Sequence, residues 1–496
     1  MTKNREQWKS RTGFLLAVIG SAVGLGNIWR FPYLAYRNGG GAFLIPYFIA
    51  LISVGIPLMM MEQGIGHCLR GSTPLVFARV KRRWEFGGWW IVTFVSLGIL
   101  LYYSVVLGWC MNYLTYSFDL AWGPDTGAFF EQQFLNISAS PFDISGIQIP
   151  ALVGVFIVWF IIWFFIYRGI AKGIEFASII FMPVLFIIMI VLVVWSISLP
   201  GAGEGIRAYL YPNFETLKSP GVWVDAFGQI FFTLSLGMGI MMAYASYLPA
   251  RSEIKKNALI SCFSNCGFEV FAGFAVFATL GFMAMKSGVP VNEVAKGGPG
   301  LAFVTYPQII NQLPFGGNVF GILFFLALIF AGLTSAISIL EALISGLIDK
   351  FGWPRKTVVT ISCILGFFGS LIFASDAGLY WIDIVDYFLN HYGLLVAGLV
   401  ETILIAWIYR ATKLQEHINS SGENKLGKWW VYVVSIWIPL VLSVLLTIDI
   451  LKNLETPYGG YSTDVLVFIG IGWIVITLVV AAIFTRLKWK RVIENR

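Results

Sequence analysis

A chain of 496 residues that is 58% hydrophobic and only 12% charged, with a mean hydropathy of +0.80, carries too much apolar side chain for a water-soluble fold. Its formal net charge of +7 lies mostly in loops between apolar runs, which favours a role in membrane topology over nucleic-acid binding. The runs are about 20 residues or longer, which fits helices crossing a ~30 Å hydrocarbon core and excludes the short alternating strands of an outer-membrane barrel. The sequence therefore predicts an all-α integral membrane protein.

The apolar runs predict about twelve membrane spans. They centre near residues 14–36, 41–68, 88–117, 151–168, 174–199, 222–248, 257–285, 318–348, 357–374, 379–409, 428–450 and 464–486. Lys and Arg gather before the first span, between the second and third, between the sixth and seventh, and after the last, whereas residues 119–150 contain neither. Because positively charged loops stay in the cytoplasm, we expect both termini to be cytoplasmic, in a multi-pass protein of the plasma (inner) membrane.

The first span contains the segment Gly20–Asn27 (GSAVGLGN), which is too rich in glycine for an uninterrupted helix. Each Gly inside a helix costs roughly 1 kcal/mol relative to Ala, and backbone that leaves the helix at membrane depth is tolerated only where it lines a cavity. A second such segment, Thr233–Gly239 (TLSLGMG), lies in the sixth span. Two interrupted helices in corresponding halves indicate a transporter with its substrate and ion site at the breaks.

Neutral oxygen atoms are expected to gather at these breaks. An interrupted first helix frees the carbonyls of Gly20, Ala22 and Val23 and exposes amides near Leu25 and Gly26. Side-chain oxygens come from Asn27, Thr233 and Asn265. Such oxygens suit a small alkali cation, and a substrate carboxylate entering as a ligand would neutralise the ion and couple the two. The alternative is that buried Asn and Thr only hydrogen-bond between helices, which accounts less well for the glycine-rich breaks.

Four separated motifs resemble the neurotransmitter:sodium symporter family. They are Gly20–Tyr33 (GSAVGLGNIWRFPY), Asn38–Phe43 (NGGGAF), Gln229–Gly237 (QIFFTLSLG) and Ala331–Ser335 (AGLTS). The resemblance implies a LeuT-type fold, in which spans 1–5 (residues 1–199) and spans 6–10 (residues 200–411) are inverted repeats. Spans 11 and 12 (residues 412–496) are then appended. It also implies sodium-coupled transport by alternating access, with two sodium sites and no organic cofactor.

The family's site residues carry over to matching positions of this chain. The resemblance places the first sodium ion at Ala22, Asn27, Thr233 and Asn265, and the second at Gly20, Val23, Ala331, Thr334 and Ser335. It places the substrate at Ser21, Ala22, Gly24, Leu25, Gly26, Ile99, Tyr103, Phe232, Thr233, Ser235, Met238, Ser335 and Ile339. Taken singly, a Thr–Ser pair or an apolar residue in a span is typical of packing. By the resemblance, Gly24 stands at the position where monoamine carriers of the family have an aspartate. The glycine therefore favours a substrate with its own carboxylate.

Charged residues within the predicted spans are costly and need partners or a water path. By resemblance, Arg30 and Asp386, with Gln229 beside them, form the extracellular gate. The cytoplasmic gate comprises Arg5 and Asp349, with Trp8, Ser246 and Tyr247. Glu269 lies one turn beyond Asn265, where chloride-dependent relatives have a neutral hydroxyl residue and chloride supplies the charge, so Glu269 favours chloride independence. Glu62 and Glu341 are assigned structural hydrogen bonds.

These observations predict a sodium-coupled symporter of neutral, hydrophobic or aromatic L-amino acids that needs no chloride. The alternatives are a sodium-coupled carrier of a related small amine or indole-type compound, a proton-coupled carrier of the same fold, and a non-transporting amino-acid receptor. We expect no enzyme, because the sequence has no nucleophile–base or metal-ligand constellation. The expected partners are the amino acid and the lipid bilayer, without nucleic acid, and the sequence leaves the oligomeric state open.

Overall fold

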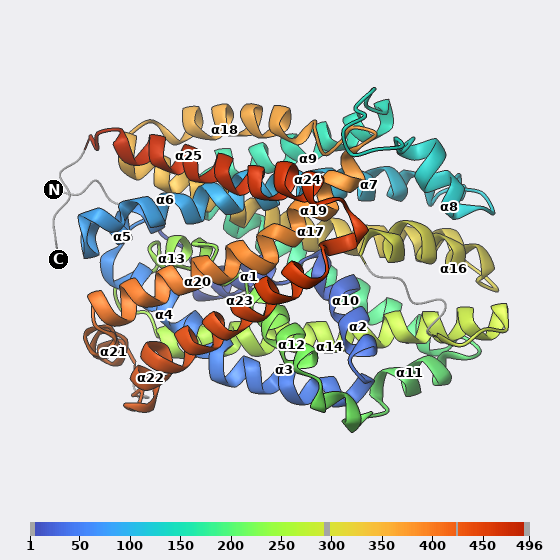
Figure 1. The fold of residues 1–496 in the computed structure, drawn as a ribbon, viewed down its shortest axis with the longest axis horizontal. Helices are drawn as coiled ribbons and strands as arrows, with labels where there is room; N and C mark the ends of the chain where they lie inside the picture. Colours follow the sequence, from blue (N-terminus) through green and yellow to red (C-terminus); the bar gives the residue numbers. More distant parts are fainter. Residues whose placement is uncertain (1–4, 292–297, 423–424, 491–496) are drawn as a thin grey trace.

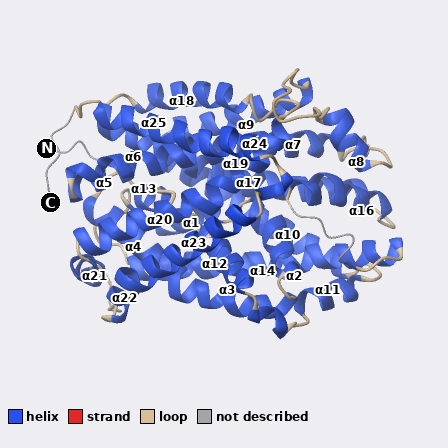
Figure 2. Ribbon diagram, viewed as in Figure 1, coloured by secondary structure: helices blue, strands red, loops and turns tan. Residues whose placement is uncertain are grey.

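The computed structural model describes residues 5–291, 298–422 and 425–490. Every regular element within these ranges is a helix, and their one β-type contact is an isolated bridge between Ile147 and Ser375 (Figure 2). A helix satisfies its backbone hydrogen bonds internally, which a chain crossing a hydrocarbon layer requires. The all-helical membrane architecture predicted from the apolar runs is confirmed.

Nine helices of the described ranges are long and apolar enough to span a membrane. A tenth candidate is the pair α1 (Arg11–Ala22) and α2 (Leu25–Arg37), which bends by 51° at its junction. The two other predicted spans are the interrupted pair α12 (Pro220–Thr233) and α13 (Ile240–Ala245), and the shorter α18 (Arg355–Ser370). Each predicted span therefore lies on a helix or on an interrupted helix.

Several of the long spans consist of α-helical segments joined by a π-helical turn, so that each still runs as one rod. The nine are α3 (Leu44–Ala50) with α4 (Ile56–Leu69), α6 (Glu85–Phe94) with α7 (Leu100–Tyr116), α9 (Ile149–Tyr167), α10 (Glu175–Ile197), α14 (Ile254–Ser287), α17 (Gly317–Phe351), α19 (Gly378–Phe388) with α20 (Leu394–Thr402), α22 (Trp429–Tyr432) with α23 (Ile438–Glu455), and α24 (Thr463–Val465) with α25 (Gly472–Arg486).

The spans run side by side along the long axis of the molecule (Figure 1). Both chain ends lie at the same end of this axis, near the short helices α5 (Thr73–Val80) and α21 (Ala411–Ser420). The short helices at the opposite end are α8 (Thr126–Ala128), α11 (Ala202–Leu210) and α16 (Tyr306–Gln312). An even number of crossings brings both termini to one side, so this arrangement agrees with twelve spans.

Burial separates central spans from peripheral ones. In the most apolar window of Arg82–Tyr116, 89% of the residues are buried inside the protein, against 28% in both Trp429–Gly460 and Thr463–Arg486. Large apolar side chains such as Leu454 on α23 and Phe468 before α25 are exposed, as expected of a surface in contact with lipid. The last two spans therefore lie outside the core that contains both interrupted helices.

Candidate functional site

The first helix break is shorter than the predicted segment Gly20–Asn27. Helix α1 continues into that segment as far as Ala22, where the Val23 N–H still donates to the Ile19 carbonyl at 2.7 Å. Only Val23 and Gly24 adopt extended backbone between α1 and α2. The last carbonyl groups of α1 consequently have no partner further along their own helix, and they face whatever packs against the break.

The second break covers residues 234–239, between α12 and α13, where the sequence predicts it. Ser235, Gly237 and Gly239 have φ angles of +54°, +71° and +71°. Glycine adopts left-handed backbone without steric cost, so the two glycines let the chain leave the helix. Ser235 is strained there, and its Oγ donates to the Ser21 carbonyl at 3.0 Å, which joins the second break to the first.

Ser335 on α17 lies against the first break. Its Oγ is 3.3 Å from the carbonyl oxygen of Gly20, 3.1 Å from that of Ser21, 3.3 Å from that of Val23 and 3.3 Å from that of Ala331. One hydroxyl proton satisfies one acceptor at a time, so lone pairs of the other carbonyl oxygens converge on the same small volume. Neutral oxygens gathered in this way are the ligands that a hard cation prefers.

Thr334 lies beside this cluster of carbonyl oxygens. Its Oγ1 donates within α17, at 3.1 Å from the Phe330 carbonyl and 2.9 Å from that of Ala331. A Cβ on Gly20 would lie only 3.0 Å from the Thr334 Cβ, so α1 and α17 are in direct contact here. The fold thus brings together the five residues predicted for the second sodium ion.

Asn27, Thr233 and Asn265 form a closed ring of hydrogen bonds. The Asn27 amide nitrogen donates to Thr233 Oγ1 and to Asn265 Oδ1, both at 3.0 Å, and the Asn265 amide donates to Thr233 Oγ1 at 3.0 Å. The Asn27 Oδ1 accepts the Gly24 N–H at 2.8 Å. These three side chains are 0–2% exposed. Ala22, the fourth residue predicted for the first sodium ion, is the last helical residue of α1.

Glu269 is fully buried, one helical turn beyond Asn265. Its carboxylate accepts the Tyr47 O–H and, at 2.5 Å, the amide of Gln229. Thr233 is a further hydrogen-bonding neighbour, so the carboxylate lies directly beside the ring of three side chains. Gln229, which was predicted beside the extracellular gate, donates its amide hydrogen bond to Glu269. Tyr47 was missed, since a single phenol in an apolar span has no periodic signal.

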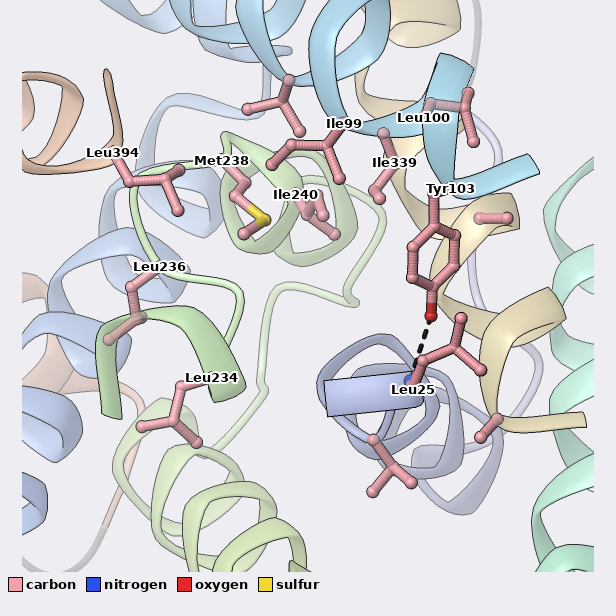
Figure 3. Packing of buried hydrophobic residues seen from close by; sticks show 14 of the residues in the cluster. Leu25, Ile99, Leu100, Tyr103, Leu234, Leu236, Met238, Ile240, Ile339 and Leu394 are labelled. Atoms are coloured by element: carbon pink, nitrogen blue, oxygen red, sulfur yellow. Dashed lines mark hydrogen bonds between the residues drawn. The ribbon is translucent and has the colours of Figure 1, made fainter. Parts of the chain in front are cut away.

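Apolar side chains from three elements meet near the breaks. Ile99 before α7, Met238 in the second break and Ile339 on α17 are 3%, 3% and 5% exposed. In Figure 3 these three side chains lie in the upper part of the view. The Tyr103 ring lies there too and points down to the start of α2. The Tyr103 hydroxyl accepts the Leu25 N–H at 3.2 Å (Figure 3). The wall opposite the first break is therefore apolar, with one hydroxyl aimed at the backbone.

Two glycines allow this close approach. A Cβ on Gly24 would lie 3.0 Å from the Tyr103 hydroxyl and 3.1 Å from Ser335 Oγ. A Cβ on Gly26 would lie 2.7 Å from a ring carbon of Phe232. Any side chain at these positions would enter the space between the breaks, α7 and α17. The predicted substrate residues therefore lie on elements that meet at one place.

The end of the molecule that carries the N-terminus contains two partly buried ion pairs. Arg5 Nη1 lies 2.8 and 2.9 Å from the two carboxylate oxygens of Asp349, and Arg5 Nε donates to Ser246 Oγ at 3.0 Å. The guanidinium carbon is 4.8 Å from the centroid of the Tyr247 ring. The residues predicted for the cytoplasmic gate are therefore in mutual contact.

The second ion pair lies at the same end. Glu341 on α17 is fully buried and pairs with Arg355 at the start of α18, with Nη1 3.1 Å from Oε1. The Tyr247 hydroxyl donates to the same carboxylate at 2.8 Å. Trp8 packs over the site and donates its indole N–H to the Tyr244 carbonyl at 2.9 Å. Glu341 was predicted to make structural hydrogen bonds, and its ion pair with Arg355 was not predicted.

At the opposite end of the path, Arg30 and Asp386 form no ion pair with each other in the described part of the chain. The Arg30 guanidinium carbon lies 4.7 Å from the centroid of the Phe232 ring. Asp386 accepts the Tyr102 O–H and, at 2.7 Å, the amide of Asn390. The expected pair is not formed in this conformation, because each side chain has a nearer partner.

The chemistry of the site is that of neutral oxygens and helix ends. Across the described ranges, no three or more His, Cys, Asp and Glu side chains form a group that could hold a metal ion. The C-terminal end of α1 carries partial negative charge and the N-terminal end of α2 partial positive charge. Such a break can hold a cation at one helix end and a carboxylate at the other.

Comparison with known proteins agrees with this geometry. Residues 5–126 and 123–492 match the model of the Sodium:neurotransmitter symporter family. An uncharacterized sodium-dependent transporter of Methanocaldococcus jannaschii is 45% identical over 484 residues, which cover 98% of each chain. A sodium-dependent dopamine transporter of Caenorhabditis elegans is 30% identical, covering 92% of this chain and 82% of its own. A sodium- and chloride-dependent taurine transporter of Rattus norvegicus is 32% identical, covering 95% and 82%.

Proposed function

Because the chain belongs to the sodium:neurotransmitter symporter family, we propose that it couples sodium entry to the uptake of a neutral L-amino acid with a hydrophobic or aromatic side chain. Sodium-dependent symport of a small molecule by a multi-pass membrane protein follows from the family itself. The substrate class, the two ion sites, the chloride requirement and the orientation in the plasma (inner) membrane are the proposed part.

The observation that carries the proposal is the set of carbonyl oxygens around Ser335 Oγ. A sodium ion there would take the lone pairs that a single hydroxyl proton leaves unused, and Thr334 would add a hydroxyl oxygen. The ion would tie the end of α1 to α17. Each sodium ion entering a negative interior gains ~2.3 kcal/mol per 100 mV, which supplies the driving force for uptake.

A second sodium ion is proposed at the ring of Asn27, Thr233 and Asn265. Each amide that donates in the ring also carries a carbonyl oxygen, and a half-turn of the amide presents that oxygen instead. The substrate carboxylate would complete the shell near the N-terminal end of α2. Substrate and ion would then bind together, because each neutralises the charge of the other in a site with little water.

The substrate class is argued from what surrounds the breaks. Ile99, Met238 and Ile339 supply an apolar wall, and Met238 can repack around side chains of different shape. A charged substrate side chain against this wall would be buried without a partner, at a cost of several kcal/mol. Gly24 leaves the space near the Tyr103 hydroxyl free of a protein carboxylate, which favours an amino acid over a decarboxylated amine.

Chloride independence is proposed from Glu269. Its buried carboxyl group lies beside Thr233 and is held by Tyr47 and Gln229, so a protein group that can supply the negative charge lies next to the proposed ion. We expect Glu269→Ser to make uptake depend on chloride, whereas the wild type takes up substrate equally in chloride and gluconate. Chloride dependence that is the same in both proteins would contradict this role.

The chain organisation is proposed on similar grounds. Residues 1–199 and 200–411 would form two inverted repeats, each beginning with an interrupted helix, with residues 412–496 appended. The low burial of the last two spans supports their assignment as helices appended to the two repeats. Both termini lie at the same end of the molecule, and the predicted loops on that side are basic. These two observations support a cytoplasmic location for both termini.

Uptake into proteoliposomes tests the proposal. We expect labelled leucine, methionine or tryptophan to accumulate in sodium buffer, and accumulation to stop when potassium or choline replaces sodium at constant pH. Tryptamine, which lacks the carboxylate, should compete poorly. Undiminished uptake without sodium would point to proton coupling, competition by amines alone would favour the amine carrier, and binding without counterflow of labelled substrate would indicate a receptor.

A further inference from the structure

A groove lies on the outer surface of the third, tenth and twelfth spans, away from both helix breaks. Its volume is about 450 Å³, and its apolar lining includes Phe86, Trp90, Val396, Val400, Ile474 and Leu478, from α6, α20 and α25. Figure 1 shows α6 between α20 and α25. None of the predicted substrate, ion or gate residues lines this groove, so it requires a separate explanation.

The groove ends at a basic side chain. Arg83, in the turn before α6, is exposed and lines the groove together with Trp84. Arg83 has no ion pair or hydrogen-bond partner among the described residues. Lys81 and Arg82 are exposed beside it, and Lys488 follows the end of α25. Positive charge therefore concentrates where the groove meets the end of the spans.

The nearby carboxylate does not neutralise this charge. Glu85 is 1% exposed and is already held by Lys350 Nζ at 2.6 Å, by the Trp489 indole at 2.8 Å and by Arg82 at 3.2 Å. Its charge is compensated within the protein, and Arg83 is left to pair with an anion from outside. Basic clusters next to grooves between membrane helices fit the headgroups of anionic lipids.

We propose that this groove binds the acyl chain of an anionic phospholipid, whose phosphate is held at Arg83. The lining from Val400 to Tyr392 follows the tenth span for about two helical turns, so a chain can lie lengthwise in the groove with its headgroup at the basic end. Trp84 contacts the lipid at the membrane interface, and Trp90 contacts its acyl chain. The bound lipid packs between the third, tenth and twelfth spans.

The test is thermal unfolding of the purified full chain in uncharged detergent, titrated with phosphatidylglycerol or with phosphatidylcholine. Native mass spectrometry on the same samples counts the lipids retained. We expect phosphatidylglycerol to raise the melting temperature more than phosphatidylcholine does, because a ligand of the folded state stabilises it. Equal gains from both lipids would overturn the preference for an anionic headgroup.

Three variants locate the site. Arg83→Gln should weaken the apparent affinity for phosphatidylglycerol roughly fivefold, the effect of one basic side chain near a charged surface. Leu478→Trp should fill the groove and remove the gain, and its melting temperature without added lipid shows whether it folds. Arg251→Gln, which changes an exposed basic side chain in the loop after α13, is the matched control and should behave as wild type.

The outcomes distinguish a lipid bound in the groove from a general attraction of anionic lipids to basic side chains on the surface. A full gain in Arg83→Gln, or an equal loss in Arg83→Gln and Arg251→Gln, would overturn the proposal. A loss in Arg83→Gln with an unchanged gain in a folded Leu478→Trp would also overturn it, because the headgroup would then bind without the acyl chain entering the groove.

Discussion

The two ends of the central path contain similar residue types in opposite states. At one end Arg5 Nη1 contacts both carboxylate oxygens of Asp349, supported by Ser246 and Tyr247. At the other end Arg30 and Asp386 belong to separate clusters. The end with Arg5 has two ion pairs that are largely shielded from water, whereas Arg30 and Asp386 form no such pair. The difference shows that two charged residues matched to one gate by resemblance need not be in contact in the folded chain.

Removing a charged partner should cost more free energy at the end with Arg5 and Asp349 than at the opposite end. Removing one partner of a buried, hydrogen-bonded charge pair typically costs 3–5 kcal/mol, because the other charge stays buried alone. At the opposite end each charged group already has a substitute partner, an aromatic face for Arg30 and a phenol for Asp386. Changing either of these substitutes should therefore have a smaller effect than breaking the pair at the end with Arg5.

The largest effect is expected from Arg5→Ala, which leaves Asp349 without its guanidinium. We expect the inner end to open, with roughly a hundredfold shift in the conformational equilibrium for a cost of about 3 kcal/mol. Transport should fall, and a reporter cysteine on the inner path should react faster with a polar thiol reagent. Lys256→Ala is the matched control, because Lys256 pairs with Glu253 at an exposed site and should change little. Unchanged reactivity in Arg5→Ala would show that this pair does not keep the end closed.

The next effect concerns the carbonyl cluster between the two ends. Ser335→Ala removes the hydroxyl at its centre and should raise the sodium concentration for half-maximal uptake by roughly tenfold. Sodium titrations of uptake measure this. Ser345→Ala is a suitable control, because Ser345 is buried on the same helix and its hydroxyl donates only to the Ala342 carbonyl, at 2.9 Å. Equal sodium dependence in the two variants would argue against an ion at Ser335.

A smaller effect of the opposite sign is expected at the end that contains Arg30 and Asp386. Tyr102→Phe removes the phenol that now donates to Asp386, at a cost of about 1 kcal/mol for the lost hydrogen bond. Asp386 then becomes more available to Arg30, and closure of this end should become more favourable. A reporter cysteine on the outer path should react a few times more slowly. Faster reaction would mean that the phenol promotes closure.

The smallest effect concerns a histidine pair next to the end with Arg5. His67 Nε2–H donates to the Pro249 carbonyl at 2.9 Å, so its Nδ1 accepts the Nε2–H of His417 on α21 at 3.0 Å. Burial, with the nearby His67 and Arg70, lowers the pKa of His417 to about 4. The pKa in the unfolded chain is about 6.5, so the neutral pair contributes fully above that pH.

Stability should therefore fall as the pH is lowered from about 6.5 towards 4, since protonation breaks the bond that holds α21 to α4. The melting temperature measured across this range checks the expectation, and His417→Gln should flatten the dependence. A slope that is identical in the variant would assign the pH effect to other groups. Glu416 and Lys413 on the same helix are exposed and remain in both proteins.

Local features of the sequence located the two breaks. The cost of glycine in a helix depends on neighbours along the chain, and the segments Gly20–Asn27 and Thr233–Gly239 both contain the interruptions found in the fold. The length of the first break was not predictable. α1 continues to Ala22, and the Val23 N–H still donates to the Ile19 carbonyl.

The partners of the charged groups were only partly predictable. Arg5 and Asp349 were matched through family motifs, yet Arg355, Tyr102 and Tyr47 carry no motif of their own. Each is chosen by the distance between side chains on different helices, and Gln229 bonds to Glu269 for the same reason. No periodic pattern along one helix encodes that distance.

The sequence by itself determined the membrane class, the positions of the breaks and the residue types proposed for each gate, because these depend on apolar runs, local helix cost and motifs along the chain. The tertiary structure alone decided that carbonyls of Gly20, Ser21, Val23 and Ala331 meet at one serine hydroxyl, and that one gate pair is joined while the other is apart. Those are relations between helices far apart in the chain. Their distances follow from how the helices pack, which is a property of the whole fold.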